Sequence, residues 1–143
     1  MPAQTDLTMW PDYCPICFGE IAHGTRICPH CGQDIDAWTT RTPYSQRLIH
    51  ALANPHPEVR MGAIISLGQR REVVAIPALV ETALAYPSDV VQGLEILHTL
   101  AEMPAEDVRR QALSTLAADH PAHAVRSTAT DLLERYSAPH HNH

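Results

Sequence analysis

The sequence predicts an all-α protein with a small β domain at its N-terminus, and three observations lead to this prediction. All four cysteines of the 143-residue chain lie between positions 14 and 31. After position 43, prolines separate segments of helical length. The composition is 45% hydrophobic but only 5% aromatic, which favours closely packed helices over a sheet sandwich. The chain therefore divides into a small head and a larger helical body.

The cysteines form two CxxC pairs separated by ten residues. Two residues between paired cysteines let one tight turn direct both sulfur atoms at a single ion. The pairs therefore predict one tetrahedral zinc site with the ligands Cys14, Cys17, Cys28 and Cys31. Because four thiolates leave no position open for water, we expect a structural zinc that supplies most of the head's folding free energy.

The flanks of the two pairs indicate matching turns. Gly32 follows the second cysteine of its pair directly, and Gly19 follows one residue late, where a turn favours the positive φ that glycine adopts easily. Between the pairs, Gly24 is expected to turn a short hairpin. Cys14-Pro15-Ile16-Cys17 and Cys28-Pro29-His30-Cys31-Gly32 resemble the knuckles of small zinc-ribbon domains, over roughly residues 10–36. Phe18 departs from that pattern by displacing the first glycine.

Two other interpretations of the cysteines remain beside zinc. An isolated CxxC pair can act as a dithiol redox switch, and four cysteines can form a secreted disulfide framework. Matched flanks favour zinc, and no charged and apolar signal segment opens the chain, so a cytoplasmic location is expected. His30 is expected to be an exposed knuckle residue rather than a spare ligand.

A polar stretch separates the head from the body. Residues 37–43 are predicted to be a linker that follows a zinc ribbon with its N-terminal extension, residues 1–36. Trp10 and Trp38 bracket the ribbon, and their large apolar area is expected to seat it on the helices.

The body is predicted to span residues 44–136 as six helices. Proline is disfavoured inside helices, and prolines at 55, 57, 87, 104 and 121 divide the segment. The expected helices are at about 44–54, 58–70, 74–86, 88–102, 105–119 and 122–136. Apolar triplets spaced four apart agree with them: Val59, Ala63 and Leu67; Val108, Ala112 and Leu116; Val125, Ala129 and Leu133. The His-rich residues 137–143 are expected to form a disordered tail.

The helices contain an internal repeat. Val59, Gly62 and Ile65 recur 31 residues later as Val90, Gly93 and Ile96. A Val-Arg step recurs near helix starts at Arg60, Arg109 and Arg126. These features resemble HEAT repeats, especially the short type of phycobilisome-lyase-like proteins, over residues 44–136. The resemblance implies an α-solenoid of about three helical hairpins with an extended binding surface. The ribbon is expected to cap the first hairpin. Val91 and His98 depart from the repeat.

The expected function is that of a non-enzymatic protein-interaction adaptor or scaffold that binds a protein partner through the solenoid surface. The chain has no HExxH motif, glycine-rich phosphate loop or His-Glu dipeptide, and His120 and His123 form at most a weak metal pair. No apolar run approaches the length of a membrane span. An accessory subunit of a lyase-type enzyme is a less favoured alternative.

A nucleic-acid- or ribosome-associated factor is the main alternative. The net charge of −6 argues against a general nucleic-acid binder, although all ten basic residues are arginine. A cluster of arginines on one solenoid face would favour this alternative: Arg60, Arg70, Arg71, Arg109, Arg110 and Arg126. The identity of the partner and the oligomeric state do not follow from the sequence.

Overall fold

The computed structural model describes residues 12–137 of the chain. The N-terminal extension with Trp10, and the tail from residue 138 onward, lie outside the described residues. The predictions for Trp10 and for a disordered tail are therefore untested.

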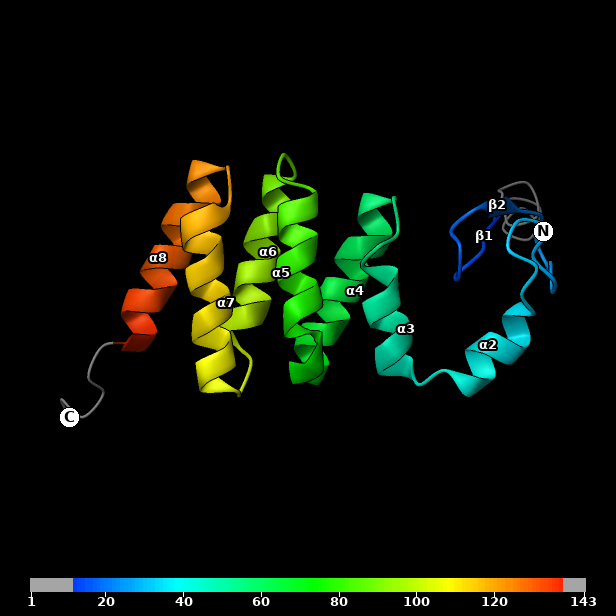
Figure 1. The fold of residues 1–143 in the computed structure, drawn as a ribbon, viewed down its shortest axis with the longest axis horizontal. Coiled ribbons are helices and arrows are strands. Elements are labelled where there is room, and N and C mark those ends of the chain that lie inside the picture. Colours follow the sequence, from blue (N-terminus) through cyan, green and yellow to red (C-terminus); the bar gives the residue numbers. More distant parts are fainter. Residues whose placement is uncertain (1–11, 138–143) are drawn as a thin grey trace, which may run out of the picture.

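The head begins with a two-stranded antiparallel sheet (Figure 1). Strand β1 (Asp12–Tyr13) pairs with β2 (Glu20–Ile21), so the first cysteine knuckle is the turn of this hairpin. Gly24 does occupy a tight turn, with φ of 82°, but the residues on either side of it pair elsewhere: Ile27 bridges to Asp34 around the second knuckle. The hairpin expected around Gly24 is thus wrong, because the first knuckle joins β1 to β2 and the second lies between the two residues of the Ile27–Asp34 bridge.

The segment predicted to be a linker is mostly helical. Helix α2 (Ile35–Arg41) starts at Asp34, whose side chain accepts a hydrogen bond from the backbone N–H of Ala37 at 3.0 Å. This N-cap satisfies a donor that the first turn would otherwise leave without a partner. The helix ends before Pro43, and the polar composition of 37–43 reflects its exposed position rather than a lack of structure.

The body consists of three antiparallel helical hairpins, as the sequence predicts. Their helices are α3 (Tyr44–Ala51) with α4 (Pro57–Arg70), α5 (Ile76–Ala85) with α6 (Val90–Ala101), and α7 (Glu106–Asp119) with α8 (His123–Ser137). A short 3-10 turn, Val73–Ala75, leads into α5. Figure 1 shows α3, α5 and α7 in one layer and α4, α6 and α8 in the other. This arrangement confirms the all-α fold class with a small N-terminal β element.

Burial in the core corrects the repeat register taken from the sequence. Val59 and Ile65 are 39% and 40% exposed, whereas Ile96, the counterpart of Ile65, is fully buried. The fully buried Ile64 and Leu67 of α4 instead correspond to Leu97 and Leu100 of α6, each 33 positions later. The 31-residue recurrence therefore matched an exposed face with a buried one and is not the structural period.

Among residues 12–137, no helix combines the length and the apolar character that crossing a membrane requires.

Candidate metal centre

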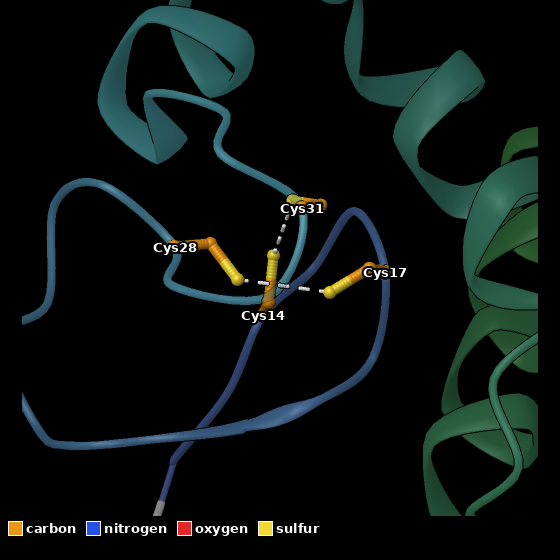
Figure 2. A group of neighbouring side chains, drawn as sticks. All are labelled: Cys14, Cys17, Cys28 and Cys31. Carbon is orange, nitrogen blue, oxygen red and sulfur yellow. Dashed lines mark hydrogen bonds between the residues drawn. The ribbon is translucent and has the colours of Figure 1, made fainter.

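The four predicted ligands lie together between the two knuckles (Figure 2). The Sγ atoms of Cys14 and Cys31 are 3.8 Å apart, and those of Cys17 and Cys28 are 3.7 Å apart. All four sulfur atoms lie within 4.8 Å of one another. The thiols of Cys14 and Cys28 are buried, whereas Cys17 and Cys31 are exposed.

These distances fit a metal ion better than a disulfide. A zinc–sulfur bond of about 2.3 Å in tetrahedral geometry places neighbouring sulfur atoms about 3.8 Å apart. A disulfide requires about 2.05 Å, which none of the described cysteines approaches. The cluster could therefore hold a single thiophilic metal such as zinc.

The two knuckles have the same backbone geometry fourteen residues apart. In the first, Phe18 N–H donates to the Cys14 carbonyl at 2.8 Å, and in the second Gly32 N–H donates to the Cys28 carbonyl at 2.8 Å. The positive φ falls at Gly32 (75°), as predicted, and at Phe18 (69°) instead of Gly19. The turn geometry is therefore set by position after the second cysteine, and Phe18 adopts a conformation that normally favours glycine.

Backbone N–H groups of the knuckles also point at sulfur. Ile16 N–H donates to Cys14 Sγ at 3.4 Å, and His30 N–H donates to Cys28 Sγ at 3.3 Å. The His30 ring is exposed, and its Nε2 lies 2.8 Å from the Glu20 carbonyl oxygen. His30 therefore ties the second knuckle to β2, a role different from that of a spare ligand.

Crowding of the four sulfur atoms distributes protons unequally among them. Burial raises the pKa of the Cys28 thiol, but the N–H groups of Cys31 and His30 and neighbouring sulfur lower it, and the result is a pKa of about 6. The N–H of Gln33 lowers the pKa of Cys31, but burial and the other three thiols raise it to about 11. A bound cation favours the thiolate form of every ligand, so metal uptake releases protons.

His50 of α3 joins the head to the body, a role that sequence reasoning missed. Its Nε2 lies 2.7 Å from the Ile16 carbonyl oxygen in the first knuckle. Its ring packs against Phe18 and Trp38, at centroid distances of 5.0 and 5.6 Å. Trp38 thus contacts the body, in agreement with the packing role expected for it. The contact of His50 spans 34 residues, and no local sequence signal marks it.

The body can now be compared with known families. Residues 40–97 match a family model described as HEAT repeats. The match runs from the end of α2 through α3, α4 and α5 into α6, and it concerns HEAT repeats in general rather than the phycobilisome-lyase-like type. No curated protein and no solved structure matches the chain.

The HEAT-like Val-Arg arginines bind backbone carbonyl groups instead of forming a charged face. Arg109 donates to the Met103 carbonyl at 2.8 Å, and Arg126 donates to the carbonyl groups of His120 and Pro121 at 2.9 and 2.7 Å. Each guanidinium thereby ties the start of its helix to the end of the preceding one.

Arg60 is 2% exposed and links two repeats. Its guanidinium donates to the carbonyl groups of Asn54 and Pro55 and to Gln92 Oε1 at 2.6 Å. It also lies 3.5 Å from the ring centroid of Tyr86. Its Nη2 also lies 3.7 Å from the Asp89 carboxylate.

His120 and His123 do not share a metal-binding arrangement. His120 is 1% exposed, and its Nδ1 accepts a hydrogen bond from Ala122 N–H at 3.0 Å. Burial lowers the pKa of His120, so the ring is neutral near pH 7. His123 is exposed at the start of α8. His120 therefore serves as a structural residue between repeats.

Proposed function

We propose that this chain is a non-enzymatic adaptor whose HEAT-repeat body binds a partner protein. The stacking of three helical hairpins in two layers carries this proposal, because such arrays expose a continuous surface along their helices. Exposed apolar side chains lie on that surface, among them Val91, which is 71% exposed, and Ile65.

We further propose that the cysteine cluster holds one structural zinc ion in a reducing compartment such as the cytoplasm. Four cysteine ligands complete a tetrahedral site and leave no position for a substrate or a catalytic water. The head's own core contains few buried residues besides the cysteines, so metal binding would supply much of its stability. The contacts of His50 with the first knuckle support a capping role for the head on the first hairpin.

The use of the Val-Arg arginines supports a protein partner over nucleic acid. A phosphate-binding face needs exposed and unengaged cations. Arg60 is buried, and Arg109 and Arg126 donate to backbone carbonyl groups. The six arginines that would favour a nucleic-acid surface are therefore divided among different roles.

Affinity capture from the native host tests the adaptor function. The tagged full chain is purified with and without nuclease, and co-purifying proteins are identified by mass spectrometry. Recovery of the same protein after nuclease treatment, at raised salt, supports the adaptor. Loss of every partner after nuclease treatment would contradict it and favour a nucleic-acid-associated factor.

A further inference from the structure

A cavity of about 380 Å³ lies where the head meets the first hairpin. Its wall includes three aromatic side chains, Tyr13, Phe18 and Trp38, in a chain that is only 5% aromatic. Val59 of α4 and Arg47 of α3 complete the side formed by the body. We call this space the junction cavity. Its volume suits one apolar side chain of a partner and part of the adjoining backbone.

The aromatic wall is held in place by histidines of the body. Tyr13 packs against His56 at a centroid distance of 4.2 Å, and Phe18 and Trp38 both pack against His50. Because each ring already contacts an imidazole, the wall is fixed before a partner arrives, which lowers the entropy lost on binding. The sheet, the knuckle and α2 each contribute one ring, so the cavity depends on the folded head.

Arg47 connects the junction cavity to a cluster of positive charge. Its guanidinium lies 5.2 Å from the ring centroid of Tyr44, and the guanidinium of Arg70 lies 5.0 Å from the same ring. Arg71 follows Arg70 at the end of α4. We call Arg47, Arg70 and Arg71 the basic edge.

The basic edge belongs to a chain whose net charge is −6. Glu72 is the carboxylate that contacts it, and this side chain is already engaged by the Ser45 hydroxyl and by Arg70 at 3.2 Å. The hydrogen bond from Ser45 and the pairing with Arg70 lower the pKa of Glu72. A local excess of positive charge on an acidic protein attracts an acidic partner and orients it.

Arg71 has a left-handed backbone conformation, which glycine adopts more easily than arginine. It is the C-cap of α4, with φ of 52°, where its N–H donates to the Gly68 carbonyl at 3.1 Å. Glycine is the usual residue at such a left-handed helix end, because a Cβ is sterically disfavoured there. An exposed arginine at this position suggests that its side chain has a use beyond the helix end.

We propose that the junction cavity and the basic edge together bind an extended acidic segment of a partner protein. One apolar side chain of the segment enters the cavity, and its carboxylates contact the basic edge through Arg47 and its neighbours. This proposal rests on the adaptor function above and names the chemistry of the partner. One oxygen of the Asp12 carboxylate in the cavity wall lies 2.9 Å from His23 Nδ1, and the other oxygen can accept a hydrogen bond from a peptide N–H.

A peptide array tests the proposal with the zinc-bound full chain. The probes are twelve-residue peptides in which one Leu, Ile, Phe, Trp or Pro precedes four glutamates, and matched peptides carry four glutamines instead. We expect the glutamate peptides to bind about tenfold more tightly at low salt, with the difference shrinking as salt rises. Equal retention of both sets would overturn the proposal, as would tighter binding of a poly(dT) oligonucleotide at the same arginines.

Matched variants locate the binding site on the chain. Val59→Glu places a charge in the junction cavity, and Val108→Glu is its control, because both valines precede an arginine near a helix start and are 39% and 42% exposed. The pair Arg70→Gln and Arg71→Gln removes charge from the basic edge, and Arg110→Gln is the control for a similarly exposed arginine paired to a glutamate. We expect the two test variants to weaken peptide binding about tenfold and the controls less than twofold.

Thermal melting of each variant shows whether it is folded. Affinity capture distinguishes failure of the acidic-segment site from failure of the adaptor function. If Val59→Glu still captures the same partner from the native host as the unmodified chain, the adaptor function stands and the site proposed here is wrong. If the unmodified chain captures no protein after nuclease treatment, the adaptor function itself fails.

Discussion

Gly62 and Gly93, which the 31-residue recurrence in the sequence matches with each other, have different surroundings in the structure. A Cβ added to Gly62 would meet no atom within 4 Å, whereas one added to Gly93 would lie 2.9 Å from Val125 Cγ2. Gly93 therefore allows α6 to approach α8 closely. Gly62 has no such neighbour and only lowers the helix propensity of α4.

Alanine substitutions at these glycines are expected to change stability in opposite directions. Gly62→Ala should raise the free energy of unfolding by about 1 kcal/mol, because alanine is the better helix former. Gly93→Ala should lower it by about 1–3 kcal/mol, because the new methyl group collides with Val125. Urea denaturation followed by circular dichroism measures both. A gain in stability from Gly93→Ala would show that α6 and α8 can separate easily.

Arg60 is expected to tolerate no substitution, not even lysine. Lysine cannot reproduce a planar guanidinium that donates to Gln92 and two carbonyl groups while stacking on Tyr86. Arg60→Lys should therefore lower the free energy of unfolding by about 2–3 kcal/mol, whereas exposed Arg110→Lys should change it by less than about 0.5 kcal/mol. Equal denaturation midpoints for the two variants would refute this account of Arg60.

At the scale of elements, the two knuckles differ in how much strain each contains. Gly32 adopts its positive φ without a steric penalty, whereas Phe18 adopts the same conformation with a Cβ. The Phe18 ring packs against His50 of α3, so the strained residue is also the one that contacts the body. The first knuckle therefore contributes two cysteines to the candidate metal centre and also docks the head on the body.

Phe18→Gly is expected to separate these two roles. Zinc affinity, measured by competition with a chelator, should stay the same or rise up to about fivefold, because glycine removes roughly 1 kcal/mol of left-handed strain. The NMR signals of the His50 ring should shift, because the aromatic neighbour is lost. A tenfold fall in zinc affinity would instead mean that the phenyl ring supports the metal centre directly.

At the scale of the whole molecule, the head and the body have different sources of stability. The body has a continuous apolar core that runs through all three hairpins, whereas the head's small core contains two of its cysteines. Both tryptophans of the chain, Trp10 and Trp38, lie outside the predicted solenoid, so tryptophan emission reports on the head and its junction. Helical circular dichroism reports mainly on the body.

Metal removal is therefore expected to unfold the head and leave the body folded. Adding EDTA should shift tryptophan emission to longer wavelength, while most of the ellipticity at 222 nm remains. The emission and ellipticity of Cys17→Ser should resemble those of the EDTA-treated protein. Added zinc should restore the emission of the EDTA-treated protein but not that of Cys17→Ser. Complete loss of helical signal on chelation would mean that the body cannot fold without its cap.

Much of the fold follows from local sequence. The spacing of Cys14, Cys17, Cys28 and Cys31 predicts their convergence, because each pair lies on one turn and needs no distant contact. Prolines and apolar spacing predict six body helices to within a few residues, because both act within single turns. Helix α2 escaped prediction because its only strong signal is the Asp34 cap, which precedes polar residues of low helix propensity.

The sequence by itself determined which four cysteines come together, the order of the helices and their pairing into hairpins. The tertiary structure decided which faces are buried, so Val59 and Ile65 are exposed despite their periodic spacing. It also decided the contact of His50 with the first knuckle, the buried position of Arg60 and the junction cavity. The physical reason is that helix and turn signals extend over a few residues, whereas these contacts join residues about thirty positions apart and depend on how hairpins pack.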